Sequence, residues 1–213
     1  MLNFPLLKRK ILNNGALVIS LLKLRPLLAK IGEGSIVIDC GANVGDITNQ
    51  FAKTGATVHS FEPDPAAFAR LEKRFKDVSN VILHQKAAWI EDTQIPFFFH
   101  EARSENELEL TVSSSVIGNK SNVSNTNKVM VDAIDLVAFI ENLNTQIALI
   151  KIDVEGAEIE ILKHILEKET YKKFDLAVVE THETKIPGHV EEVAQIKVMM
   201  QERGVENVRL NWI

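Results

Sequence analysis

The chain has 213 residues, enough for one α/β domain with a sizeable core. Its 46% of hydrophobic and 25% of charged residues are ordinary for a globular protein, and its net charge of −5 lacks the basic excess of nucleic-acid-binding domains. Cys40 is the only cysteine, so no internal disulfide can form and a reducing, cytoplasmic compartment is expected.

Residues 1–34 precede the first strong strand pattern and are interpreted as an N-terminal helical segment. A basic cluster at 8–10 is followed by the apolar run 15–22, which is shorter than the roughly 20 apolar residues that span a bilayer. Basic residues follow at once, without the small-residue cleavage site of a signal peptide. We favour an amphipathic helix that covers the domain. The alternative is peripheral membrane contact, with residues 1–30 on anionic lipid.

From residue 35 onward, strand and helix patterns alternate. The continuous apolar run 35–40 is typical of a strand buried on both faces. Phe68 and Leu71 lie on one face of a helix that Asp64 caps. Strands are expected at 35–40, 57–61, 80–84, 147–152, 175–179 and 208–213, and helices at 46–54, 65–75, 135–142, 157–168 and 190–203. Repeated β-α units predict a doubly wound, mostly parallel sheet in a three-layer α/β/α fold.

An insertion at about 94–131 interrupts the domain of residues 35–213. Its pattern predicts one or two antiparallel strands and a loop rich in serine and asparagine. The serines at 113–115 are either a polar turn or contacts to a substrate, since the insertion is placed to cover the cleft. Near the end of the chain, either the last strand of the sheet is absent or 208–213 takes its place. An unpaired sheet edge would favour a homodimer.

The ends of the first two strands carry the first candidate site, because such sheets bind ligands beyond the carboxyl ends of their strands. The first strand ends in DCGANVG, where Gly41 allows close approach to the backbone. The second ends in FEP, and Glu62, 21 positions beyond Gly41, suits the two hydroxyls of a ribose. Asp39 would repel a pyrophosphate but suits an ammonium group, so S-adenosylmethionine fits better than NAD. We expect Asp39 and Glu62 to face one hollow. The alternative is a tight β-α turn without a ligand.

A second group of candidates follows two later strands. Asp153 and Glu155, in KIDVEGAE, project at the carboxyl end of one strand, and Glu180 and His182, in VVETH, follow the next strand. Carboxylates gathered at strand ends are costly unless something positive lies nearby. These four side chains are therefore expected on one side of a cleft. The alternatives are a helix-capping role for Glu155 and its neighbour Glu158 and a surface position for the histidine.

At these motifs the sequence resembles the FkbM family of S-adenosylmethionine-dependent methyltransferases. The resemblance covers about residues 35–182 and is carried by VIDCGANVGDIT, FEPDP, IDLVAF, LIKIDVEGAEIEIL and VVETH. It implies a class I methyltransferase fold and methyl transfer to a hydroxyl of a sugar, polysaccharide, lipid or polyketide-type natural product. The resemblance implies that these residues bind the cofactor: Asp39, Gly41, Ala42, Asn43, Gly45, Glu62, Pro63, Ala87 and Asp153.

Methyl transfer to a hydroxyl requires alignment of the two reacting atoms and removal of a proton. His182 is the favoured base and Asp153 the alternative, with Glu155 and Glu180 as further catalytic candidates. Another alternative is a bound Mg²⁺, by analogy with catechol-type O-methyltransferases. Its ligands would be Asp153 and Glu180, with His182 or Glu155. That analogy is partial, because Gly156 stands where those enzymes carry a lysine. Two other functions stay open: an NAD-linked oxidoreductase, and a non-catalytic relative that binds only the cofactor or a partner.

Overall fold

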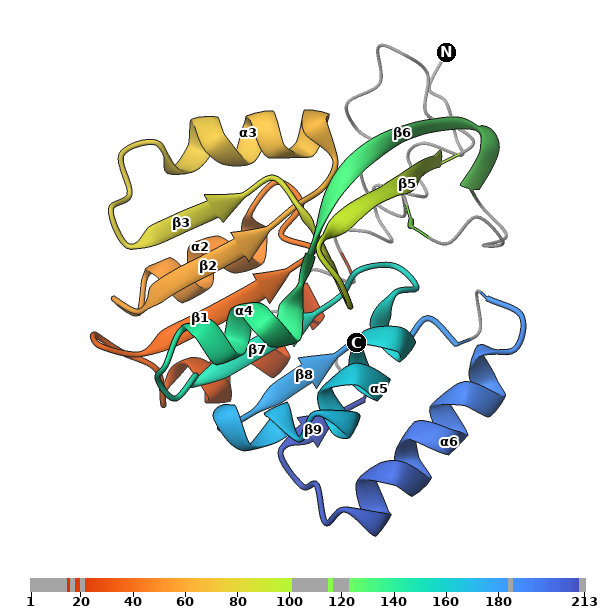
Figure 1. Ribbon diagram of the computed structural model, residues 1–213. Coiled ribbons are helices and arrows are strands. Elements are labelled where there is room, and N and C mark those ends of the chain that lie inside the picture. Colours follow the sequence, from red (N-terminus) through yellow and green to blue (C-terminus); the bar gives the residue numbers. More distant parts are fainter. Residues whose placement is uncertain are drawn as a thin grey trace.

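The computed structural model has a central sheet flanked by helices (Figure 1). It describes residues 15, 18–19, 22–100, 115–116, 123–183 and 186–210. Several expectations fall outside this described part, namely those for the basic cluster at 8–10, for Ser113 and Ser114, and for residues 211–213.

Six strands form the central sheet, in the order β3-β2-β1-β7-β8-β9, and every pairing is parallel. The strands are β1 (Ile36–Cys40), β2 (Thr57–Phe61), β3 (Val81–His84), β7 (Leu149–Ile152), β8 (Ala177–Val179) and β9 (Val208–Arg209). The chain runs outward from β1 to β3 and then returns to β7, so the order reverses between β1 and β7. Ligands of doubly wound sheets bind at this reversal, beyond the carboxyl ends of the strands.

Helices cover both faces of the sheet, which confirms the expected three-layer arrangement. They are α2 (Asp46–Ala52), α3 (Pro65–Phe75), α4 (Leu136–Asn142), α5 (Glu158–Glu167) and α6 (His189–Glu202), with a short 3-10 helix η2 (Thr170–Lys173). Val37 of β1 packs with Phe51 of α2 and with Leu24, whereas its neighbour Ile38 packs with residues of α4, α5 and α6. Leu24 belongs to a helical stretch at 22–28 and is completely buried.

Two aspartates set the starts of their helices. Asp64 accepts a hydrogen bond from the backbone N–H of Ala66 at 2.8 Å, before α3. Asp135 accepts one from the N–H of Ala138 at 3.0 Å, before α4. Each bond satisfies a backbone donor that the first turn of a helix leaves open, and the helix starts predicted from these residues are confirmed.

A second sheet lies between β3 and α4 in the chain. It has the order β4-β6-β5 and consists of β4 (Ala87–Trp89), β5 (Thr93–His100) and β6 (Val123–Asp135). The antiparallel pair of β5 and β6 confirms the strands expected at 94–131, and Figure 1 shows this pair projecting beyond the central sheet. The sequence did not predict β4, because three residues are too few to show a period.

One edge of the central sheet is formed by β9, which pairs in parallel with β8. Within the described residues the central sheet contains no antiparallel strand. The segment expected at 208–213 therefore provides a short edge strand, and its described part pairs only through Val208 and Arg209.

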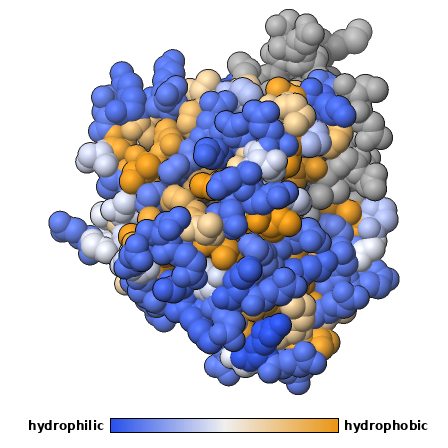
Figure 2. All heavy atoms as spheres, in the orientation of Figure 1, coloured by the Kyte–Doolittle hydropathy of each residue, from blue (hydrophilic) through white to orange (hydrophobic). Residues whose placement is uncertain are grey.

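The face of the molecule that is turned toward the viewer in Figure 1 is mainly polar. Figure 2 shows this face as largely hydrophilic, with separate hydrophobic areas. Large exposed apolar side chains include Val190 and Val198 of α6. Across the described ranges, no helix combines the length and the apolar character that crossing a bilayer requires.

Candidate active site

The turn from Gly41 to Gly45 joins β1 to α2 and is tightly enclosed. Both glycines have positive φ angles, 78° and 86°. A Cβ atom on Gly41 would lie 1.8 Å from the carbonyl oxygen of Asp153, and one on Gly45 would lie 2.4 Å from Cε2 of Phe75. The two glycines thus let the turn lie against the end of β7 on one side and against α3 on the other.

Glu62 lies beside this turn, at the carboxyl end of β2. Its Oε2 accepts a hydrogen bond from the backbone N–H of Asn43 at 2.8 Å, and its Oε1 accepts one from that of Asp64 at 2.8 Å. Burial raises the pKa of Glu62 to about 7, although both hydrogen bonds lower it. The fold therefore brings together the glycine turn and the acidic residue that the sequence predicts for a ribose. Pro63 follows directly.

Asp39 lies beneath the turn and has no exposed surface. Its Oδ2 accepts a hydrogen bond from the Thr48 hydroxyl of α2 at 2.7 Å, and its Oδ1 lies 3.3 Å from Nζ of Lys151. Lys151 is its direct partner in the register of β1 and β7, so both side chains enter the same buried layer. Asp39 and Glu62 therefore do not face one open hollow, because Asp39 is already enclosed by its neighbours in the fold.

Lys151 connects this buried aspartate to the turn and to the end of β7. Its ammonium group donates to the carbonyl oxygens of Cys40 and Gly41 at 3.2 and 2.8 Å, and it lies 3.5 Å from Oδ2 of Asp153. Burial alone lowers the pKa of a lysine, but Asp39 and Asp153 raise that of Lys151 above its usual range. The cation therefore stays charged and fixes β1, the turn and β7 together.

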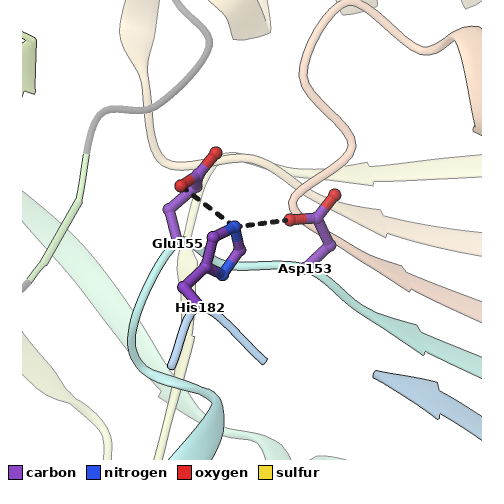
Figure 3. A group of neighbouring side chains, drawn as sticks. All are labelled: Asp153, Glu155 and His182. Atoms are coloured by element: carbon purple, nitrogen blue, oxygen red, sulfur yellow. Dashed lines mark ion pairs between the residues drawn. The ribbon is translucent and has the colours of Figure 1, made fainter. Parts of the chain in front are cut away.

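His182 lies at the centre of the second candidate group (Figure 3). It is 3% exposed, and its Nε2 lies 3.1 Å from Glu155 Oε2, 3.3 Å from Glu180 Oε1 and 3.9 Å from Asp153 Oδ1. Figure 3 shows Asp153 and Glu155 on either side of this nitrogen. The four side chains expected together at the ends of two strands thus surround one another, because β7 and β8 are parallel neighbours.

Glu158 is a fourth carboxylate beside His182. Its Oε1 lies 2.9 Å from His182 Nδ1 and accepts a hydrogen bond from the backbone N–H of Val154 at 3.1 Å. The residue before α5, Ala157, makes no side-chain cap bond. Glu158 therefore does more than favour a helix start: it fixes the turn after β7 and holds the imidazole ring.

Ser115, a residue of the insertion, also holds the turn after β7. Glu155 has a positive φ of 60°, and Gly156 follows with a φ of 130°. The buried Ser115 donates from its hydroxyl to the carbonyl oxygen of Glu155 at 2.6 Å. Ser115 also pairs through its backbone with Phe98 of β5. The insertion is thus attached directly to the acidic turn.

The charges in this region shift the protonation of two members. Burial lowers the pKa of His182, but its contacts with Glu158 and Glu180 and the charge of Glu155 raise it overall, to about 10. Burial raises the pKa of Asp153 to about 6; Lys151 opposes this shift, and the nearby Glu180 and Glu155 add to it. His182 therefore carries a proton at neutral pH when no metal ion is bound, and the pKa of Asp153 lies well above that of an ordinary aspartate.

Two other predicted cofactor residues are buried in the core. Ala42 packs with Leu71 and Phe75 of α3. Ala87 lies in β4 and packs with Phe97 in the core of the second sheet.

Sequence analysis did not predict three contacts of the site: those of Lys151 and Thr48 with Asp39, and that of Glu158 with His182. The pattern of β7, LIKI, contains a signal for the contact of Lys151, because it places a lysine in a buried strand beside Asp39.

Comparison with known proteins gives a family match and several weaker similarities. The family model described as "Methyltransferase FkbM domain" matches residues 39–206. "Methyltransferase 1" of Beauveria bassiana (strain ARSEF 2860) is 28% identical over 192 residues, which cover 83% of this chain and 74% of that protein.

Two solved methyltransferases are more distant. An rRNA methylase from Streptococcus thermophilus has a TM-score of 0.44 and 10% identity, covering 81% of this chain and 74% of its own. A precorrin-6y C5,15-methyltransferase from Geobacter metallireducens GS-15 has a TM-score of 0.42 and 12% identity, covering 88% of this chain and 69% of its own.

The family match agrees with the sheet order, the enclosed glycine turn and the acidic residue after β2. It extends over both candidate groups, from Asp39 to the strand ends around His182. The chain belongs to the methyltransferase FkbM domain family and is an S-adenosylmethionine-dependent methyltransferase.

Proposed function

We propose that this protein transfers a methyl group from S-adenosylmethionine to a hydroxyl oxygen of an uncharged acceptor, such as a sugar, polysaccharide, lipid or natural product. The contact between the glycine turn and the acidic group carries this proposal. Gly41 lies so close to the carbonyl of Asp153 that no Cβ fits between them. A cofactor on the turn would therefore have Asp153 and its neighbours beside it.

The residues around the turn fit this cofactor. When bound, S-adenosylmethionine supplies a methyl group bonded to a positively charged sulfur. Glu62 is held at the turn by Asn43, and the free lone pairs of its carboxylate suit the hydroxyls of a ribose. Asp39 acts from beneath the turn: with Lys151 it fixes the carbonyl oxygens of the turn.

The proton of the acceptor hydroxyl goes to Asp153 in this proposal. His182 is a poor base at neutral pH, because its pKa of about 10 leaves it protonated. Asp153, with a pKa raised to about 6, is mostly ionised at pH 7 and is more basic than an ordinary carboxylate. His182 then orients the surrounding carboxylates. A divalent cation such as Mg²⁺ at these carboxylates is a second way to acidify a hydroxyl, since it binds oxygen ligands.

The charge of the site limits the acceptor. Five carboxylates surround two cationic side chains: Asp39, Asp153, Glu155, Glu158 and Glu180 lie around Lys151 and His182. A phosphorylated acceptor or a nucleic acid would be repelled by this excess negative charge. A neutral acceptor that donates hydroxyl hydrogen bonds to carboxylates fits better.

Two measurements test the proposal. Calorimetric titration with S-adenosylhomocysteine is expected to show saturable binding, whereas NAD gives none. Labelled methyl transfer is then measured on neutral glycosides, a polysaccharide and hydroxylated lipids, with sugar phosphates as the disfavoured group. The proposal fails if S-adenosylhomocysteine does not bind at millimolar concentration. Binding without transfer to any hydroxyl acceptor supports the non-catalytic alternative.

A further inference from the structure

We propose that Asp153, Glu155 and His182 form a binding site for a divalent first-row transition-metal cation, represented by Mn²⁺. The site lies within the proposed active site, and its use in methyl transfer rests on the proposed function. The binding itself does not, because a metal can be measured without cofactor or acceptor.

The spacing of the three side chains fits one ion. Each offers one ligand atom, and these atoms lie within 4.8 Å of one another. His182 Nε2 lies 3.1 Å from Glu155 Oε2 and 3.9 Å from Asp153 Oδ1. Ligands held at about 2.1 Å from a common ion are about 3 Å apart at right angles and about 4.2 Å apart when opposite. Small side-chain shifts therefore suffice to bind a cation.

The imidazole nitrogen provides an observation independent of the acidic cluster. His182 is 3% exposed, and its buried Nε2 lies 3.1 Å from Glu155 and 3.3 Å from Glu180, yet it forms no hydrogen bond of acceptable geometry with any described group. Figure 3 shows this nitrogen directed between Asp153 and Glu155. A buried polar atom without a hydrogen bond is costly, and a metal ion placed between the three groups would satisfy it.

Glu158 determines which form of the ring faces the acids. Its carboxylate only accepts hydrogen bonds, so the contact of 2.9 Å requires the hydrogen on Nδ1 of His182. In a neutral ring, the lone pair of Nε2 then points toward negatively charged oxygens, and either a proton or a metal cation must lie between them. Histidines that bind metals commonly donate their other N–H to a carboxylate, and Glu158, itself held by Val154, has this position.

The ligand set favours a transition metal over Mg²⁺. Mg²⁺ prefers oxygen ligands and keeps several waters, whereas an imidazole nitrogen suits transition metals. Mn²⁺ accepts both the carboxylates and the imidazole. Glu180, with Oε1 at 3.3 Å from Nε2, adds a further oxygen close to the ion. Ser115 holds the turn that carries Glu155.

Titration of the full-length, chelator-treated protein with Mn²⁺ and Mg²⁺ tests the inference, using calorimetry and the loss of the free Mn²⁺ signal in electron paramagnetic resonance. One Mn²⁺ per chain is expected to bind, at least about tenfold more tightly than Mg²⁺. Pulsed electron paramagnetic resonance should detect a nitrogen nucleus coupled to the bound Mn²⁺, and His182→Gln should remove this coupling. Glu155→Gln and Glu158→Gln should each weaken Mn²⁺ binding by about 10-fold or more.

Glu160→Gln is the matched control, since it changes the same charge on the outer face of α5 and should leave Mn²⁺ binding unchanged. Circular dichroism verifies that each variant is folded. Absence of saturable Mn²⁺ binding to the folded wild-type protein overturns the inference, as does equal affinity for Mg²⁺ or wild-type binding by Glu155→Gln. If Mn²⁺ binds but S-adenosylhomocysteine does not, the metal site stands and the proposed function fails.

Discussion

Lys151 and His182 each lie among carboxylates at the carboxyl ends of neighbouring strands, but their surroundings differ. Lys151 is 2% exposed and donates to two carbonyl oxygens of the glycine turn as well as facing Asp39. Its hydrogen-bonding capacity is used within the fold. Around His182 Nε2, the three carboxylate side chains keep between 17% and 24% of their surface exposed. The first region holds strands together, and the second remains accessible to a ligand.

Asp153 belongs to both regions, with Oδ2 at 3.5 Å from Lys151 and Oδ1 at 3.9 Å from His182. A change on the lysine side should therefore act mainly on stability. A change on the histidine side should act mainly on catalysis.

The largest expected effect is the loss of stability in Lys151→Met. It leaves Asp39 buried without its cation, and breaking such a pair costs about 3–5 kcal/mol in the free energy of unfolding. Denaturant unfolding measures the loss. Lys173→Met, at an exposed position, should cost less than about 1 kcal/mol. A loss below about 1 kcal/mol in Lys151→Met would contradict the structural role given to this cation.

Asp153→Asn should lower kcat by about 100-fold or more, because the amide cannot accept the hydroxyl proton. Affinity for S-adenosylhomocysteine should change much less, since the proposed role is in the chemical step. Steady-state kinetics and calorimetry separate the two quantities, with Glu160→Gln as the control for removal of a carboxylate from the same region. A kcat within about threefold of the wild-type value would remove Asp153 as the base.

The pH dependence distinguishes the aspartate from the histidine. In chelated, metal-free buffer, kcat/KM should rise about tenfold per pH unit below about pH 6 and level off above it, because Asp153 must lose its proton to act as a base. The ordinary pKa of an aspartate would place this rise near pH 4. A rise that continues toward pH 10 would instead assign the base to His182.

The smallest expected effect comes from Ser115→Ala. It removes the hydrogen bond to the carbonyl of Glu155, worth about 1 kcal/mol, and loosens the turn at the acceptor side. The KM for the acceptor should rise about fivefold, while binding of S-adenosylhomocysteine stays unchanged. Ser79→Ala, at an exposed position, serves as the control. Weaker binding of S-adenosylhomocysteine with an unchanged KM for the acceptor would instead indicate that Ser115 supports the cofactor.

The sequence by itself determined the alternating strands and helices, the caps at Asp64 and Asp135, and the gathering of Asp153, Glu155, Glu180 and His182. These features follow from local periodicity and from one rule of geometry, that the carboxyl ends of parallel strands meet at one edge. The glycine turn and Glu62 came together for the same reason.

Tertiary structure alone decided which side chains became enclosed and which stayed accessible. The register of β1 against β7 placed Asp39 opposite Lys151, and Asp39 became completely buried. Glu158 reached His182 across 24 positions, and Ser115 reached Glu155 across 40. Contacts of this kind depend on how distant segments pair and pack, which local periodicity does not encode.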